Sequence, residues 1–303
     1  MWLPNSARTT VNAEARIQGS TALVGVLGDP VRHSLSPVMH NAALEAMGLD
    51  WAYLALPAPT AELGTVIQAL EAMGCRGLNV TIPHKQAVAA LCSELSPLAE
   101  RLGAVNTLVP RQGGGWLGTN TDVEGFCAPL REVSWSSKRA LVLGCGGSAR
   151  AVVAGLVELG FAEIVLAGRR PEALEAFQAD CRSWAPQLST LSWDSGIAAT
   201  LAQADLLVNT TPVGMASATD PAAAQACPLS DSELAALSAH SWVYDLIYTP
   251  RPTALLQRAT AQGCRGLDGL RMLVEQGAAS LRLWSGSSEV PVEVMHQAAL
   301  RQL

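Results

Sequence analysis

A glycine-rich segment, Gly144-Cys145-Gly146-Gly147-Ser148-Ala149, follows an apolar run and leads into a helix-like stretch. Its spacing fits the G-x-G-x-x-G/A pattern of dinucleotide-binding folds. In that pattern Gly144 makes a tight turn, Gly146 lets the backbone approach a pyrophosphate, and Ala149 lets helix and strand pack closely. The free N–H groups of a helix that begins with Gly147 and Ser148 favour phosphate binding. We therefore expect a dinucleotide cofactor here, with a purely structural turn as the alternative.

The end of the next apolar run indicates which dinucleotide binds. An NAD site usually has an acidic residue about 20 residues after the first glycine, where it accepts a hydrogen bond from the ribose 2′-hydroxyl. Here the run ends in Ala167-Gly168-Arg169-Arg170, without an acid. Guanidinium groups pair bidentately with phosphate oxygens, so Arg169 and Arg170 suit the 2′-phosphate of NADP. NADP is favoured over NAD, and the alternative is a solvated basic turn.

Two serines stand two residues apart before a predicted helix, in Ser34-Leu35-Ser36-Pro37. Ser36 is predicted to be the N-cap, with Pro37 as the first helical residue. Two hydroxyls beside the N–H groups of a helix N-terminus could also bind a small carboxylate. From the residue types alone, capping and anion binding both stay open.

Polar residues also follow three further apolar runs, in segments 79–85, 103–107 and 118–122. Open α/β sheets bind ligands at the carboxyl ends of their strands. The side chains that could converge there on one hydroxylated substrate are Lys85, Asn106 and Asp122. Taken singly, these residues are more often a surface lysine, a turn asparagine and a helix-capping aspartate.

Short apolar runs alternate with helix-like segments along nearly the whole chain. We expect strands at residues 21–27, 51–56, 77–81, 139–143, 163–167, 206–209 and 242–246, and helices at 36–47, 60–73, 149–159, 270–284 and 291–301. This order predicts an α/β fold with a largely parallel sheet covered by helices. Residues 211–229, rich in Pro, Ala and Ser, are predicted to form a long irregular segment.

Length, charge and hydropathy exclude several classes of protein. The length of 303 residues suits two domains. With 20 Lys and Arg against 26 Asp and Glu, the net charge of −6 argues against nucleic-acid binding and against a polybasic membrane-surface protein. We find no uncharged apolar run of the roughly 18 residues that a membrane span needs.

The cysteines and histidines give no sign of a metal site. Seven scattered Cys without a Cys-x-x-Cys pair or an adjacent His cluster indicate reduced thiols in the cytoplasm, not a disulfide scaffold or a zinc site. The five His lack metal-ligand spacing and are expected at the surface or behind the site. Residues 1–20 are interpreted as a frayed leader, with a transit peptide as the alternative.

From about Thr21 to its C-terminus, the chain resembles the shikimate dehydrogenase family. The strings that carry the resemblance are Ser34-Leu35-Ser36-Pro37 with His40-Asn41, Asn79-Val80-Thr81-Ile82-Pro83-His84-Lys85, Gly103-Ala104-Val105-Asn106-Thr107, Asn120-Thr121-Asp122, and segments 208–215, 244–248 and 269–276. Several independent strings in the family's order make the resemblance specific.

The resemblance implies two α/β domains. Residues 1–121 and 269–303 would form a substrate domain completed by the C-terminal helices, and residues 122–268 a Rossmann-like NADP-binding domain. Ser34 and Ser36 would hold the substrate carboxylate, while Lys85 and Asp122 would form the catalytic pair. The residues implied at the ring hydroxyls are Thr81, Asn106, Asp122, Tyr248 and Gln276. Those added on the cofactor side are Thr210, Ile247 and Gly269.

The implied reaction is the reversible NADPH-dependent reduction of 3-dehydroshikimate to shikimate in aromatic amino-acid biosynthesis. The family's usual basic residue of the 2′-phosphate site is Ala173 here, and Arg170 is the expected substitute. One alternative is a quinate/shikimate dehydrogenase of broader specificity, although two arginines argue against an NAD-using quinate enzyme. Another is a non-catalytic NADP-sensing protein, which would be expected to lose Lys85 or Asp122. A homodimer stays open.

Overall fold

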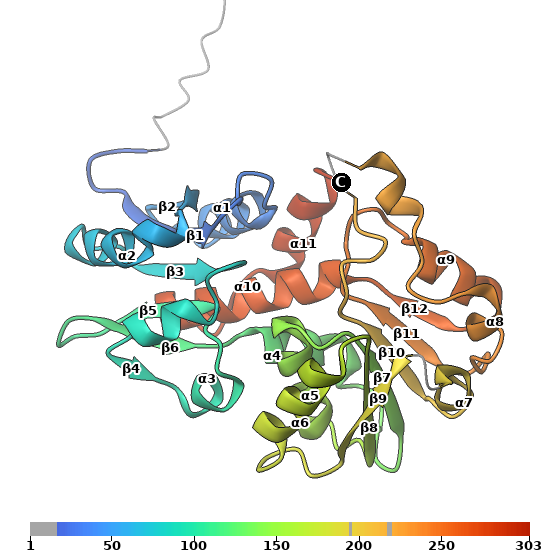
Figure 1. Ribbon diagram of the computed structural model, residues 1–303. Coiled ribbons are helices and arrows are strands. Elements are labelled where there is room, and N and C mark those ends of the chain that lie inside the picture. Colours follow the sequence, from blue (N-terminus) through green and yellow to red (C-terminus); the bar gives the residue numbers. More distant parts are fainter. Residues whose placement is uncertain (1–16, 194–195, 217–219) are drawn as a thin grey trace, which may run out of the picture.

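The computed structural model describes residues 17–193, 196–216 and 220–303, which form two six-stranded sheets with helices packed on them (Figure 1). Most of the predicted leader, residues 1–16, lies outside this description. Among the helices of the described segments, none combines the length and the apolar character that a membrane span requires. We call the sheet formed by the earlier strands the N-terminal sheet and the sheet formed by the later strands the central sheet.

The N-terminal sheet has the strand order β2-β1-β3-β5-β6-β4. Its strands are β1 (Ala22–Gly28), β2 (Trp51–Pro57), β3 (Gly77–Val80), β4 (Glu94–Leu95), β5 (Thr107–Pro110) and β6 (Trp116–Thr119). The first three pair in parallel, but β5 pairs antiparallel with both β3 and β6. With β4 also parallel to β6, three of the five pairings are parallel and the prediction of a largely parallel sheet is confirmed. The exception is β5, which the short glycine-rich connection around residues 113–115 joins to β6 as a hairpin.

The central sheet confirms the prediction of parallel strands. Its members are β7 (Arg139–Leu143), β8 (Glu163–Gly168), β9 (Leu188–Ser192), β10 (Leu206–Asn209), β11 (Trp242–Asp245) and β12 (Arg265–Leu267). They follow the order β12-β11-β10-β7-β8-β9 and all pair in parallel. This is the doubly wound order of dinucleotide-binding folds, in which the ligand binds where the strand order reverses. In this sheet the reversal lies between β7 and β10.

Helices cover both sheets, and the C-terminal ones return to the first. The helices are α1 (Ser36–Ala46), α2 (Leu63–Ala72), α3 (Pro97–Leu102), α4 (Asp122–Cys127), α5 (Gly147–Glu158), α6 (Pro171–Cys181), α7 (Ile197–Leu201), α8 (Asp231–Leu234), α9 (Ala254–Ala261), α10 (Gly269–Ser285) and α11 (Val292–Leu300). Both α10 and α11 pack against α1. Figure 1 shows α10 running between the two sheets, so it can contribute to a site that both halves share.

The predicted elements are found with small shifts. The segment predicted as a helix over residues 60–73 begins as a 3-10 turn, Thr60–Glu62, before α2. The irregular segment contains one short 3-10 turn, Pro221–Gln225, and its residues 217–219 lie outside the described part. The prediction does not include strands β4, β5, β6, β9 and β12, since each is short or lacks a continuous apolar run.

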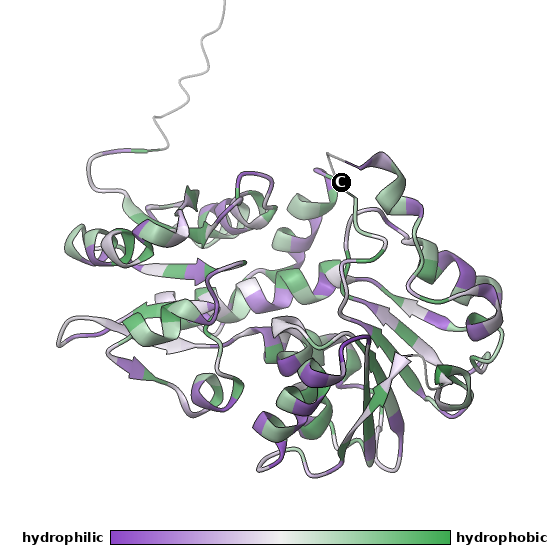
Figure 2. Cartoon of the chain, in the orientation of Figure 1, coloured by the Kyte–Doolittle hydropathy of each residue, from purple (hydrophilic) through white to green (hydrophobic). Residues whose placement is uncertain are grey.

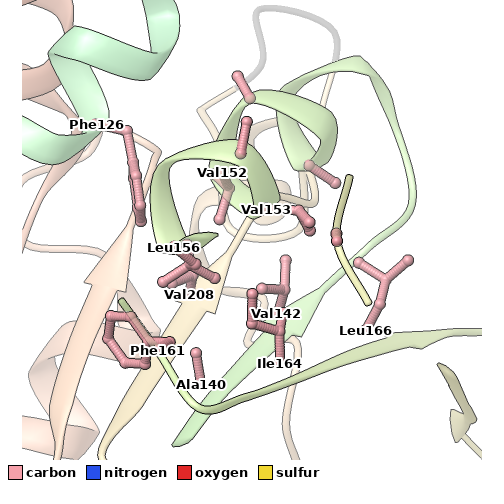
Figure 3. Packing of buried hydrophobic residues seen from close by; sticks show 14 of the residues in the cluster. Phe126, Ala140, Val142, Val152, Val153, Leu156, Phe161, Ile164, Leu166 and Val208 are labelled. Atoms are coloured by element: carbon pink, nitrogen blue, oxygen red, sulfur yellow. The ribbon is translucent and has the colours of Figure 1, made fainter. Parts of the chain in front are cut away.

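Apolar side chains from the central sheet and α5 form a continuous core. Val142 and Val208 of the strands face Val152 and Leu156 of the helix (Figure 3). Figure 2 shows the same concentration of apolar residues along the central strands. Strands buried on both faces are typical of parallel sheets covered by helices.

The short helix α4 is held closely between two longer helices. A Cβ atom at Gly155 of α5 would lie 2.5 Å from Cδ1 of Phe126 in α4. Likewise, a Cβ at Gly125 of α4 would lie 2.7 Å from the backbone oxygen of Met272 in α10. Because these glycines allow close approach, α4 has little freedom to move, and its first residue, Asp122, is fixed relative to both halves.

Candidate active site

A cavity of about 220 Å³ lies where the two halves meet. It is lined by all eight side chains predicted for the substrate, namely Ser34, Ser36, Thr81, Lys85, Asn106, Asp122, Tyr248 and Gln276. Ser148 of α5 and Leu246, which follows β11, also line it. Residues from both ends of the chain therefore meet in one space large enough for a small molecule.

Lys85 and Asp122 form an ion pair in this cavity. Nζ of Lys85 lies 2.6 Å from Oδ2 of Asp122, and the two side chains are 23% and 10% exposed. The other carboxylate oxygen, Oδ1, accepts a hydrogen bond of 2.8 Å from Nδ2 of Asn106. The carboxylate is thus held at both oxygens. Since an ammonium has three donors, Lys85 keeps N–H groups that a ligand in the cavity can use.

The backbone on each side fixes the ion pair in place. Lys85 lies in the turn after β3, and its own backbone carbonyl oxygen accepts a hydrogen bond of 2.7 Å from the backbone N–H of Val105. Its neighbour His84 is fully buried, and Nε2 of His84 lies 2.6 Å from the carbonyl oxygen of Ala58. Asp122 opens α4, where its backbone N–H donates to Oδ1 of Asn120 over 3.0 Å. Both charged side chains therefore project from anchored turns.

Behind the pair lies a buried hydrogen-bond network that the sequence analysis missed. Nδ2 of Asn79 donates to Oγ of Ser280 over 2.8 Å, and that hydroxyl lies 2.9 Å from Oγ1 of Thr107. Thr107 in turn donates to Oδ1 of Asn106 over 2.8 Å. Thr121 joins the same network through its backbone N–H, which donates to Asn106. The network orients the Asn106 amide and therefore the carboxylate of the ion pair.

Ser280 could have been found from its spacing to Gln276. The two residues lie four apart on α10, so they share one helix face. Gln276 is largely buried, and its Oε1 lies 3.5 Å from Nδ2 of Asn106. A polar pair at this spacing on a buried helix face indicates a hydrogen-bonded site.

The two serines line the cavity from the turn that leads into α1. The predicted N-cap role of Ser36 is wrong, because Leu35 already has helical backbone angles and Ser36 is the first residue of the helix. The capping interaction instead involves Ser34, whose Oγ accepts a hydrogen bond of 3.2 Å from the Ser36 backbone N–H. The Ser36 hydroxyl therefore does not cap the helix. It interacts with the side chain of buried Tyr53, and Ser36 also lines the cavity.

His40 is fully buried behind the serine turn, and His84 is fully buried beside Ala58, so neither lies at the surface, which was one of the two expected placements. The His40 ring stacks on Tyr53 with centroids 4.0 Å apart, and Nδ1 lies 2.8 Å from the carbonyl oxygen of Ser36. Burial lowers the pKa of His40 from 6.5 to about 4. The ring is therefore neutral over most of the range in which an exposed histidine becomes protonated.

The depressed pKa of His40 predicts a loss of stability in acid. Between pH 6.5 and about 4 the unfolded chain binds a proton at His40 that the folded chain does not. The free energy of unfolding should fall by about 3 kcal/mol as the pH decreases through this window, at about 1.4 kcal/mol per pH unit. We expect His40→Phe, which keeps the stacked ring, to lack this part of the pH dependence in denaturant titrations. Parallel pH profiles of variant and native protein would contradict the assignment.

A second cavity, of about 450 Å³, lies where the order of the central strands reverses. Its lining includes Gly144, Gly146, Arg169, Arg170 and Thr210 of the predicted cofactor set. The predicted tight turn is confirmed, because Gly144 has a φ of 98° and a Cβ there would lie 2.9 Å from Oγ1 of Thr210.

The remaining cofactor candidates lie elsewhere. Gly147 is exposed at the start of α5, whereas Ala149 and Ile247 are buried. Ser148 and Gly269 line the substrate cavity. Ala149 is part of the apolar core that α5 forms with the central sheet.

The charge of the second cavity is positive. Arg169 and Arg170 are both exposed after β8, and no Asp or Glu is among the described residues that line this cavity. Trp193, at the end of the unpredicted strand β9, also lines it and was missed for that reason. The two guanidinium groups suit a ligand that carries phosphate groups, and the indole of Trp193 suits an aromatic ring of the same ligand.

The described residues contain no cluster of three or more His, Cys, Asp or Glu that could hold a metal ion. All seven cysteines are free thiols, and burial raises the pKa of Cys127 to about 12. The groups available for chemistry in the substrate cavity are therefore an ammonium, a carboxylate, amides and hydroxyls.

Comparison with known proteins gives matches over nearly the whole chain. Residues 26–108 match the shikimate dehydrogenase substrate binding domain, and residues 269–300 the shikimate 5'-dehydrogenase C-terminal domain. A shikimate dehydrogenase (NADP(+)) from Trichormus variabilis is 50% identical over 295 residues, which cover 95% of this chain and 99% of that protein.

Solved structures agree. Shikimate 5-dehydrogenase from Thermus thermophilus, in complex with NADP(H) and shikimate, superposes with a TM-score of 0.81 at 35% identity, covering 93% of this chain and 100% of the other. A quinate dehydrogenase from Corynebacterium glutamicum, in complex with NAD, has a TM-score of 0.83 at 33% identity, covering 93% and 99%. Proteins of this fold therefore include a shikimate dehydrogenase in complex with NADP(H) and a quinate dehydrogenase in complex with NAD.

Proposed function

This chain belongs to the shikimate dehydrogenase family, and from that premise we propose that it catalyses the reversible NADPH-dependent reduction of 3-dehydroshikimate to shikimate. The observation that carries the proposal is the Lys85–Asp122 ion pair in a cavity lined by hydroxyl and amide groups. The neighbouring cavity, with two arginines and no acid among its described residues, supports NADP as the coenzyme.

Lys85 manages the proton in the proposed mechanism. When bound, NADPH supplies a hydride, and the protein supplies orientation and electrostatics. As the substrate carbonyl is reduced, negative charge develops on its oxygen, and the Lys85 ammonium donates the proton that neutralises it. In the oxidative direction, neutral Lys85 accepts the proton of the hydroxyl. Asp122 orients Nζ of Lys85 through their contact of 2.6 Å.

The remaining side chains bind the substrate. We assign the carboxylate to Ser34 and Ser36 beside the N-terminus of α1, where anions are favoured. The ring hydroxyls would contact the amides of Asn106 and Gln276 and the hydroxyls of Thr81 and Tyr248. The support for this set is that each member lines one cavity.

The assignment of the two domains follows from the same packing. We propose that residues 1–121 and 269–303 form the substrate domain and residues 122–268 the NADP-binding domain. The packing of α10 and α11 on α1 supports this division. The free thiols favour the cytoplasm as the location. We also include a homodimer in the proposal, and a measurement of the molecular mass in solution tests it.

Ser36 provides a test of the carboxylate site. Its hydroxyl does not cap α1 but interacts with buried Tyr53, so Ser36→Ala should lower the melting temperature only slightly. Loss of a hydrogen bond to a charged group should raise the dissociation constant for shikimate about tenfold or more. The affinity for NADP alone should not change and serves as the internal control. A much lower melting temperature with intact shikimate binding would show that the hydroxyl is structural.

A crossed assay tests the proposed function itself. Purified protein is incubated with shikimate or quinate and with NADP or NAD, and the absorbance of the reduced nicotinamide is followed. We expect the highest kcat/KM with shikimate and NADP. Comparable turnover of shikimate and quinate would identify the quinate/shikimate dehydrogenase of broader specificity, and no turnover with any pair would point to a non-catalytic NADP-binding protein.

A further inference from the structure

Two loops of the central sheet reach different cavities. The coenzyme loop, residues 210–214, follows β10, and the substrate loop, residues 246–248, follows β11. Residues of the coenzyme loop that line the second cavity are Thr210, Thr211 and Pro212. Residues of the substrate loop that line the first are Leu246 and Tyr248. The two strands are neighbours, so one anchor between them can hold both loops.

Asp245, the last residue of β11, is such an anchor. Its side chain is fully buried, and Oδ1 accepts hydrogen bonds from Nδ2 of Asn209 over 3.0 Å and from the Ile247 backbone N–H over 3.2 Å. Oδ2 accepts from Oγ1 of Thr253 over 2.7 Å. A carboxylate buried among neutral donors is costly and is kept only where its hydrogen bonds are satisfied.

The carboxylate also fixes the orientation of the Asn209 amide. An ionised carboxylate only accepts, so the NH₂ group of Asn209 must face Asp245 and its Oδ1 must face the coenzyme loop. There Oδ1 accepts from the backbone N–H of Thr211 over 3.0 Å and from its hydroxyl over 2.7 Å. Thr211 is held as a donor to Asn209, and its own Oγ1 accepts from the Val213 backbone N–H over 3.3 Å.

On the substrate side the same carboxylate holds Ile247. The Ile247 carbonyl oxygen accepts a hydrogen bond of 3.1 Å from the backbone N–H of Gly269, the first residue of α10. This helix carries Gln276 into the substrate cavity. Just beyond the two loops, the Ala216 backbone N–H donates to the Thr249 carbonyl oxygen over 2.9 Å.

We propose that Asp245 is a positioning residue for both ligands, and that Asn209 relays its effect to the coenzyme loop alone. The proposal rests on the proposed function, since it concerns how the chain orders the NADP and shikimate sites. The competing interpretation is that the pair only joins β10 to β11. A matched control exists near the opposite ends of these strands, where Oγ of Ser241 donates to the Ala204 carbonyl oxygen over 2.6 Å and Ser241 is similarly buried.

The experiment compares Asp245→Ala, Asn209→Ala and Ser241→Ala by calorimetric titration of the full-length protein with NADP and with shikimate separately. Asp245→Ala should raise both dissociation constants about 5- to 30-fold. Asn209→Ala should raise that for NADP and leave that for shikimate within about twofold. Ser241→Ala should lower the melting temperature and leave both constants within about twofold. Asp245→Asn keeps an acceptor oxygen and should restore most of both affinities.

Clear outcomes would overturn the proposal. It fails if Ser241→Ala raises both constants as much as Asp245→Ala, or if Asp245→Ala changes neither. If Asp245→Ala does not fold, the Asn209→Ala variant tests the proposal. An unchanged NADP affinity of that variant would contradict the role of Asn209 in positioning the coenzyme loop. Failure of the proposed function is distinguishable, because the unmodified protein would then not reduce NADP with shikimate.

Discussion

Replacing Lys85 with alanine is expected to lower the turnover number by about 10²–10⁴-fold, the usual cost of losing a general acid–base group. The expectation follows from the contact of 2.6 Å between Nζ of Lys85 and Asp122 in the substrate cavity. If Lys85 only bound substrate, the Michaelis constant for shikimate would rise and the turnover number would be spared. Steady-state kinetics in both directions at saturating substrate separate the two roles.

Substitutions of the same pair sharpen this test. Lys85→Arg should restore little activity, because arginine stays charged and its planar group differs in shape from an ammonium. Asp122→Asn should also slow turnover, since the amide no longer holds the ammonium by charge. The double variant should be less impaired than the product of the two single losses, because paired residues act as a unit. Multiplicative losses would contradict the pairing.

Two observations guard against a trivial loss of activity. Circular dichroism and NADP affinity of Lys85→Ala should match those of the native protein, because Lys85 does not line the coenzyme cavity. A variant with near-normal turnover at saturating shikimate would refute the catalytic role of Lys85.

The sequence predicts best those parts of the chain whose local pattern and tertiary role coincide. The glycine segment at 144–149 stands between an apolar strand and a helix, and the positive φ of Gly144 is the conformation that the pattern requires. Among the eight substrate candidates, Thr81 and Lys85 follow a strand of the N-terminal sheet, where ligands of α/β folds bind. Tyr248 follows a strand of the central sheet and Gln276 lies on α10, so packing between the two halves brings them to the same cavity. The convergence of the eight candidates followed from the resemblance, since each residue alone also suits a surface or capping role.

What the sequence misses depends on contacts between distant segments. Strands β4 and β5 are two and four residues long, too short for a period to be seen, and pairing alone defines them. Ser280 accepts a hydrogen bond from Asn79, which lies 201 residues away, so the helical spacing to Gln276 indicates a polar site but does not reveal this partner. The start of α1 differs from the prediction by one residue, because the backbone of Leu35 and not the capping preference of Ser36 sets the boundary.

Coenzyme choice gives the second large expected effect. Arg169→Ala should raise the Michaelis constant for NADP roughly ten- to a hundred-fold, because a hydrogen bond to a charged phosphate contributes about 1.5–3 kcal/mol. The constant for NAD should change little, since NAD lacks the 2′-phosphate. Both constants come from initial rates at fixed shikimate. Arg182→Ala, at the end of α6 and likewise exposed, is the matched control and should alter neither constant.

Arg170 is expected to share this contact, because the family's second basic position is Ala173 in this chain. If both guanidiniums bind the phosphate, the double variant should lose most of the preference for NADP, and added salt should weaken NADP binding to the native protein more than to the double variant. No Asp or Glu is among the described residues that line the cavity, so the double variant has no carboxylate to accept a hydrogen bond from the ribose 2′-hydroxyl of NAD. The double variant should therefore become less selective without becoming a good NAD enzyme. An equal rise of both Michaelis constants would show that Arg169 and Arg170 act on a part of the coenzyme that NAD and NADP share.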